Sequence, residues 1–556
     1  MERVEQLETV EQIEGATATA PRAGRQARAD GPDDVPEPVA LSRPPDDQPW
    51  LRLIAALRRD DWNLVVRLVQ AWLVAWLVMS FVVQMNIGLA DNGDYARFMG
   101  TITSGPVGLE NWLAPGSQAY HDRFFNYWLP YWHLDWPLQW SPTAVMLLWL
   151  PGALLNAAVY SRDVLWLPLL GLPIKLALLG LVLLLFVWIE RRARQQRLLL
   201  TLVLAGPLVL ELSTTDFVAP INTFYREAGS MVYLLLFVAS VLYLNARPTS
   251  RARWWLCLGA TVLLTLAKAS DIYWPLIAVP FLMWRSASHF TWPRLLGRAA
   301  VGAALIGVLI LGSQKLLADP TNQVTSYDNF FNSALLVSRH PADHLQRLGM
   351  PDALPCIGLS VYVGPGLDCY VRYRDRMRLS NSLSVMFFEP MVVVYQFQLG
   401  LDELADQSYE WHGIYSASDP RASTAPTIAG PFDQRYWGER SNLPLNFWSW
   451  LRFNTFPHGW PAFAALALFA ALAWVGSRQA GPGQDLALIC LIAVVACIFD
   501  IQVQVVGEGT QDLIRHLFLS NMLFDLAGIA AVGSVLCRLT ARPWLTRRTA
   551  AEGRAA

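Results

Sequence analysis

Apolar stretches of about 20 residues recur along most of this chain, separated by shorter polar segments. A helix of that length crosses the roughly 30 Å of hydrocarbon in a bilayer. The pattern therefore predicts an all-α integral membrane protein with about ten transmembrane helices. The predicted crossings are residues 64–86, 164–189, 198–212, 228–246, 254–267, 272–284, 299–317, 460–476, 485–505 and 513–536.

Three apolar segments fit this pattern less simply. Segments 254–267 and 272–284 are short, so either they lie in a thin region or the "AKASD" between them turns at membrane depth and lines a cavity. Residues 142–160 are apolar too, but a full crossing there would place the basic cluster "RRARQQR" (191–197) outside. We expect that segment to be a re-entrant or surface-lying helix.

Composition agrees with a membrane protein. Hydrophobic residues make up 54% of the chain and charged residues only 16%, whereas soluble proteins carry about 25%. The net charge of −1 and the lack of a basic tract with interleaved aromatics argue against a nucleic-acid partner. Residues 1–50 are polar and almost free of aromatics, which predicts a disordered cytoplasmic tail, and residues 541–556 form a second tail.

The basic residues set the expected orientation. Arg58, Arg59 and Arg67 flank the start of the first span, so the positive-inside rule places the N-terminus in the cytoplasm. Residues 60–540 then form the membrane domain, with two long outer loops at 87–163 and 318–459. Tails rich in alanine and arginine are typical of a GC-rich bacterial gene, and we expect a multi-pass protein of the bacterial cytoplasmic membrane.

Two of the six cysteines lie in a predicted outer loop. Cys356 and Cys369 flank Gly364, Pro365 and Gly366, which we expect to form the turn that brings the two thiols together. The outer compartment is oxidising, so a disulfide is the favoured interpretation. Two unpaired buried thiols are the alternative.

Ionisable residues gather at the outer ends of the predicted spans. A charge within a span costs about 2.5–3.5 kcal/mol on insertion scales, so each such residue suggests a function. Each also has a structural explanation, such as helix capping, an exposed ion pair or a snorkelling lysine. The residues are Asp91, Asp94, Arg97, Arg226, Glu227, Lys268, Asp271, Asp512, Arg515 and His516.

Glycosyl transfer from a lipid-phosphate donor would use this arrangement. The donor phosphate at the headgroup level needs cationic partners, and Arg226, Lys268, Arg515 and His516 are at that level. The acceptor hydroxyl needs a carboxylate general base within about 2.6–3.2 Å. An aspartate of the glycine-containing "DNGD" turn after the first span would supply it.

Four segments carry a resemblance to a known family. They are "DNGDYARFM" (91–99), "FYREAGSMVY" (224–233), "AKASD" (267–271) and "GEGTQDLIRHLFLSNMLFDL" (507–526). In this order they look like the GT-C superfamily of polytopic glycosyltransferases, and more closely like the bacterial glycan-biosynthesis hexose transferases of the WsfD type. The resemblance covers most of residues 60–540.

The resemblance implies a single GT-C helical bundle with an outward-facing site and an inverting mechanism. The donor would be a polyprenyl-phosphate hexose, and the acceptor a glycan or another cell-envelope molecule outside the membrane. The first-loop base maps onto Asp94, with Asp91 as the alternate. Arg515 and His516 would contact the donor phosphate, with Arg97, Glu227, Asp271 and Asp512 in support.

The resemblance leaves metal use open. Some members use a divalent cation, which would be Mg²⁺ or Mn²⁺ here. The two carboxylates of "DNGD" are three residues apart rather than adjacent, which departs from the usual pattern. The second long loop would form a lid that helps to select the acceptor.

Other functions remain as alternatives. A ligase or polymerase with a diphosphate-linked donor would want a strongly cationic outer loop, and "RYRDRMR" (372–378) provides several arginines. A transporter of lipid-linked sugars would want polar groups in mid-span and paired broken helices. A non-catalytic membrane scaffold is the fourth interpretation.

The sequence generates one direct prediction. Asp94→Asn should abolish transfer of radiolabelled sugar from polyprenyl-phosphate donors by membranes containing the protein, because the acceptor hydroxyl loses its base. Asp91→Asn should be less severe or sensitive to EDTA. Expression and folding should not change. Equal transfer by the wild type and Asp94→Asn would show that Asp94 is not the general base and would favour Asp91 instead.

Overall fold

The structure of this protein is a computed structural model. The predicted tails, nearly all of the predicted span 299–317 and the "DNGD" motif lie outside the described residues. The structure describes residues 62–85, 128–129, 143–287 apart from 163, 164, 193, 223 and 224, residue 302, 321–404 apart from 360, 362 and 363, 445–478 apart from 457, and 481–540 apart from 511 and 512.

Long apolar helices dominate the described part of the chain. Six of them could each cross a membrane, or eight spans result if each of two sharply bent helix pairs counts as one. The chain is therefore a multi-pass helical membrane protein, while the count of ten crossings stays a prediction. The six helices are α2 (Trp62–Val83), α7 (Leu167–Glu190), α11 (Glu227–Ala246), α21 (Trp460–Ser477), α22 (Pro482–Glu508) and α24 (Phe518–Thr540).

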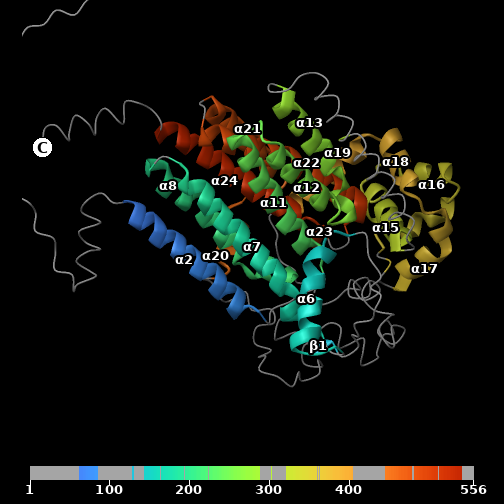
Figure 1. Ribbon diagram of the computed structural model, residues 1–556. Helices are drawn as coiled ribbons and strands as arrows, with labels where there is room; N and C mark the ends of the chain where they lie inside the picture. Colours follow the sequence, from blue (N-terminus) through green and yellow to red (C-terminus); the bar gives the residue numbers. More distant parts are fainter. Residues whose placement is uncertain are drawn as a thin grey trace, which may run out of the picture. The chain divides into compact units, whose positions relative to one another are not determined.

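Burial separates central from peripheral helices. In α11, 78% of the most apolar window is buried inside the protein, against 22% in α21 and 33% in α2. Helices α21, α22 and α24 pack side by side (Figure 1). Gly476 permits this approach, because a Cβ there would lie 1.7 Å from Ser534 Oγ, which donates a hydrogen bond to the Gly483 carbonyl.

The predicted span 198–212 is helical, but the helix is broken just beyond it, at Ser213 and Thr214. The two halves of this broken helix, Gln196–Leu212 and Thr215–Ile221, are bent by 58°. The Ser213 carbonyl accepts hydrogen bonds of 2.7 Å from both Ser80 Oγ and Gln84 Nε2, so this carbonyl is hydrogen-bonded although it lies at the break. Its pieces are α8 (Arg194–Leu200), the π-helical η1 (Thr201–Ala205), α9 (Gly206–Leu212) and α10 (Thr215–Ile221).

The "AKASD" segment is a turn between two short helices, α12 (Arg251–Thr265) and α13 (Trp274–Ala287), and the 3-10 helix η2 (Ala269–Tyr273) begins within it. The Leu266 carbonyl accepts from the Ala144 amide, and the Ala267 carbonyl accepts from Thr143 Oγ1, both at 2.8 Å. The segment is thus a turn whose carbonyls accept hydrogen bonds from residues 143–144, while its position at membrane depth stays a prediction.

The predicted re-entrant or surface segment 142–160 contains α6 (Met146–Val159). Its 14 residues span about 21 Å, which is shorter than the hydrocarbon thickness. Gly152 packs against the start of α7, where a Cβ would lie 2.6 Å from the Leu170 carbonyl oxygen. Two short antiparallel strands, β1 (Trp128–Leu129) and β2 (Leu165–Trp166), pair beside α6.

The described part of the predicted second outer loop is largely helical. Residues 321–403, here called the disulfide lobe, have their own apolar core around Tyr327, Phe331 and Met350. The lobe contains α15 (Thr321–Asn329), the π-helical η3 (Phe330–Ala334), α16 (Pro341–Arg347), η4 (Pro351–Cys356), α17 (Gly364–Tyr373), η5 (Arg374–Arg376), α18 (Leu379–Phe388) and α19 (Met391–Glu403).

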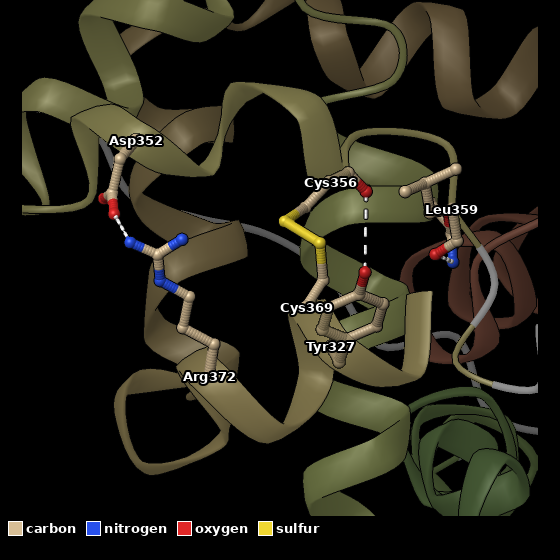
Figure 2. The surroundings of a disulfide bond; sticks show 7 residues. Tyr327, Asp352, Cys356, Leu359, Cys369 and Arg372 are labelled. Carbon is tan, nitrogen blue, oxygen red and sulfur yellow. Dashed lines mark hydrogen bonds and ion pairs between the residues drawn. A yellow bond between two sulfur atoms is a disulfide. The ribbon is translucent and has the colours of Figure 1, made fainter. Parts of the chain in front are cut away.

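A disulfide joins Cys356 and Cys369 in this lobe, as the sequence predicted (Figure 2). Tyr327 donates a hydrogen bond to the Cys356 carbonyl, and Arg372 pairs with Asp352 nearby. The predicted glycine–proline turn is wrong in detail. Gly364 begins α17, and proline is well tolerated in the first turn of a helix because its missing N–H has no intrahelical partner there.

The lobe is attached to the end of α22. Ser333 Oγ donates to the Val505 carbonyl at 2.8 Å, and Gln396 Nε2 donates to Ser333 Oγ at 2.6 Å. Helices α18 and α19 form the second sharply bent pair, at 112°. Val385 and Val392, on either side of the bend, belong to the lobe core, so we assign the bend to the lobe.

Glu389 stabilises this bend. It accepts hydrogen bonds from Ser338 Oγ at 2.6 Å, from the Arg339 amide at 2.8 Å and from His344 Nε2 at 3.2 Å. Burial alone would raise the pKa of the Glu389 carboxyl, but these hydrogen bonds outweigh it and the pKa lies below its ordinary value. The ionised form is therefore the one that the folded lobe binds.

This arrangement predicts acid sensitivity of the lobe. A depressed carboxyl pKa adds stability that is present above the ordinary glutamate value and is lost as pH falls through the folded value. Thermal unfolding of the purified protein should therefore show an acid-dependent loss of lobe stability that is smaller in Glu389→Gln. Asp343→Asn, which changes an exposed acid in the same lobe, is the control. Identical pH profiles for wild type and Glu389→Gln would contradict the assignment.

Candidate functional site

Four ionisable side chains from three separate segments meet at the start of α11. Glu227 opens α11, and Lys268 lies between α12 and η2. Arg515 and His516 belong to the short helix α23 (Leu513–His516). Glu227 Oε1 is 3.0 Å from Lys268 Nζ and 3.6 Å from Arg515 Nη1, and His516 Nδ1 is 2.8 Å from Lys268 Nζ. We call this group the Glu227 cluster.

The four side chains of the Glu227 cluster together carry a net positive charge and are largely buried. Its side chains are only 5–12% exposed. Lys268 Nζ donates to His516 Nδ1, which requires the lone pair of that nitrogen. With His516 neutral, Lys268 and Arg515 outweigh Glu227 by one positive charge. The Arg515 guanidinium also lies 4.7 Å from the centre of the Tyr225 ring. The cluster is thus suited to holding an anionic group such as a phosphate.

Two local features position these residues. Lys268 has an extended backbone that separates α12 from η2, which directs the chain across the end of α11. Gly509 ends α22 with a φ of +71°, and a Cβ there would lie 2.8 Å from the Asp328 carbonyl oxygen. Only glycine adopts this left-handed conformation readily, so α22 stops there and the chain turns toward α23.

The structure brings together three of the four predicted phosphate-binding residues, with Glu227. The fourth, Arg226, is half-buried and directly precedes α11. The predicted last span 513–536 is wrong at its start, because α23 is separate from α24. The candidate bases Asp94 and Asp91, together with Arg97 and Asp512, lie outside the described residues.

Asp271 lies beside the Glu227 cluster and interacts electrostatically with Lys268 and Glu227. It is 1% exposed and accepts a 2.5 Å hydrogen bond from Ser230 Oγ of α11. Asp500 of α22 lies near it, and its carboxylate accepts from Ser520 Oγ at 2.5 Å and from Gln504 Nε2 at 3.0 Å. These two acids are bound by hydroxyl and amide donors.

A third group of buried charges was not predicted from the sequence. Arg452, on α20 (Phe447–Thr455), is 1% exposed, and its Nη1 lies 2.6 Å from Asp525 Oδ1 of α24. Trp448 Nε1 also donates to Asp525, at 2.9 Å. Glu211 of α9 is fully buried against both Arg452 and Asp525.

The charges of this trio do not balance unless a proton is present. Two carboxyl groups face one guanidinium where no water can screen them, and an unpaired buried charge is very costly. Protonation of one of the two carboxyl groups makes the trio neutral. Such a carboxyl–carboxylate pair beside an arginine is a site that can take up and release one proton.

A signal for these acids was present in the sequence. Glu211, Asp500 and Asp525 each interrupt an apolar run, in "LVLEL", "CIFDI" and "MLFDL", and a charge inside a span is a functional hypothesis by default. Their partner Arg452 lies in the predicted outer loop, where nothing in the pattern marks it as buried. Among the described residues, no group of three His, Cys, Asp or Glu side chains could hold a metal ion.

The fold and these charged groups define a polytopic helical membrane protein with ionisable residues buried between its helices. A family model described as the YfdI N-terminal transmembrane domain matches residues 52–358, more than half of the chain, and the chain belongs to this family. The matched part contains Glu227, Lys268 and Asp271, whereas Arg515 and His516 lie beyond it. No curated protein and no solved structure matches the chain.

The charge count of the trio predicts opposite effects of two substitutions. Arg452→Met should lower the free energy of unfolding by about 3–5 kcal/mol, because it leaves buried carboxyl groups without their cation. Glu211→Gln should change it little or raise it, because one carboxylate then faces one guanidinium. Denaturant unfolding of the purified protein in detergent measures both. The trio is wrongly described if Arg452→Met costs no more than Glu211→Gln.

Proposed function

We propose that this chain is a membrane glycosyltransferase. It moves a hexose from a polyprenyl-phosphate donor to a glycan or cell-envelope acceptor outside the membrane, with inversion. The observation that carries the proposal is the Glu227 cluster, in which Lys268, Arg515 and His516 meet from distant segments at one end of the bundle. A lipid-anchored phosphate is the anion that reaches the end of an apolar helix bundle from within the membrane.

The cluster would act mainly by positioning. Lys268 and Arg515 would contact the donor phosphate, while Glu227 holds both cations in place through its 3.0 Å and 3.6 Å contacts. The acceptor oxygen attacks the anomeric carbon as the bond to the phosphate oxygen breaks, and polyprenyl phosphate leaves. The acceptor proton passes to a carboxylate, for which we propose Asp94 or Asp91. A divalent cation, Mg²⁺ or Mn²⁺, could assist that step.

A transporter of lipid-linked sugars is the second candidate. Two observations favour it: the two buried carboxyl groups that share Arg452, and the helix break that bends by 58° beside Glu211. Buried acids and discontinuous helices are features of proton-coupled transporters. The two candidates differ in what they need, because a transferase makes a covalent product without an ion gradient.

The transferase proposal predicts a donor-binding defect. Lys268→Gln and Arg515→Gln should each raise the KM for a polyprenyl-phosphate sugar about tenfold or more, since each removes a charged hydrogen bond to phosphate. The assay is transfer of radiolabelled sugar by membranes, with diphosphate-linked donors in parallel. Arg251→Gln is the matched control, because Arg251 is exposed and begins the same helix, α12, whose far end leads to Lys268.

Two results would count against the transferase. One is unchanged transfer by both cluster variants. The other is sugar movement across sealed vesicles that makes no covalent product and stops when the proton gradient is collapsed, which is what the transporter requires. A preference for the diphosphate-linked donor would instead identify a ligase or polymerase.

A further inference from the structure

A groove open to the surface runs along the helix pair α2 and α7, which lie next to each other in Figure 1. Its volume is about 550 Å³. Its walls are mainly apolar, with Val74 on one helix and Leu183 and Phe186 on the other. Arg67 and Arg191 line the same groove at one end. The groove thus combines an apolar channel with two cations at its mouth.

The two arginines differ from their basic neighbours. Arg192 pairs with Asp485 at 3.4 Å, and Arg197 pairs with Glu190 at 3.2 Å. Glu190 is the one acidic residue that lines the groove, and Arg197 is its partner. Arg67 and Arg191 are exposed, and within the described residues neither pairs with a carboxylate. Arg191 instead lies 5.6 Å from the centre of the Tyr243 ring, which holds its guanidinium at the groove.

We propose that this groove binds an anionic glycerophospholipid of the membrane. One acyl chain lies along the apolar wall, and the phosphate lies between Arg67 and Arg191. Arginine is the side chain best suited to bidentate phosphate contacts. Positive residues gather at this end of the bundle, which the positive-inside rule assigns to the cytoplasm, where the leaflet surface is negatively charged.

This site is separate from the Glu227 cluster. Tyr243, beside Arg191, and Glu227 stand at opposite ends of α11, about 24 Å apart along the helix axis. A lipid in the groove therefore does not occupy the position proposed for the donor phosphate. The inference is independent of the proposed function, and either can fail alone.

The test is lipid titration of the full chain, purified and delipidated in detergent, followed by native mass spectrometry. The probes are phosphatidylglycerol and phosphatidylcholine with the same acyl chains. Wild type should bind phosphatidylglycerol more tightly. Arg67→Gln with Arg191→Gln should bind it about 30-fold more weakly, from about 1 kcal/mol per arginine. Ala71→Trp, which fills the groove without changing charge, should also weaken binding.

Two controls keep the outcome interpretable. Arg251→Gln with Arg478→Gln removes the same charge from exposed residues outside the groove and should bind phosphatidylglycerol as wild type does. Arg67→Lys with Arg191→Lys keeps the charge and should retain the preference for phosphatidylglycerol, which excludes a folding defect as the cause. Equal binding of the two lipids by wild type, an unaffected glutamine variant or an unaffected Ala71→Trp would each overturn the proposal.

Discussion

Within a bilayer no water is available to hydrogen-bond an exposed backbone carbonyl. Wherever a helix of this protein is interrupted, the carbonyls left without a helical partner must therefore accept hydrogen bonds from another part of the chain. The Ser213 carbonyl accepts a hydrogen bond from α2, and the Leu266 and Ala267 carbonyls accept hydrogen bonds from residues 143–144. Each interruption also stands beside a buried or half-buried charge, Glu211 in the first case and Lys268 in the second. Two of the charged groups thus occur where helices are interrupted, whereas Asp500 and Asp525 lie within the long helices α22 and α24.

The acids of the bundle are neutralised in three different ways. Glu227 is surrounded by cations and remains 5% exposed. Asp271 and Asp500 are held by hydroxyl and amide donors and have almost no exposure. Asp525 has a guanidinium, but it shares that cation with Glu211. Among the acids in the part of the chain that the structure describes, Glu227 contacts two cationic side chains, Lys268 and Arg515, and the Glu227 cluster is therefore the group on which we base the proposed anionic ligand.

The sequence predicted the parts of this arrangement that depend on neighbouring residues. Lys268, Arg515 and His516 were visible as charges at the ends of apolar runs, and the cysteine pair as two thiols 13 residues apart in an outer segment. The pairing of Arg452 with Asp525 was not visible, because it joins residues 73 positions apart and one of them lies in a predicted loop. The separation of α23 from α24 was missed as well, since Leu517 is apolar and nothing local marks the break.

The shared cation also has a consequence for how the protein is made. Glu211 enters the membrane early in synthesis, whereas Arg452 and Asp525 belong to the last helices. About 300 residues separate Glu211 from Asp525, which at about 5–20 residues per second is roughly 15–60 s of translation. During that interval Glu211 has neither of its final partners, so the early helices must be inserted with this side chain neutral or near the membrane surface. The arginine and aspartate that complete its surroundings arrive last, and they can dock only onto a bundle that has already formed.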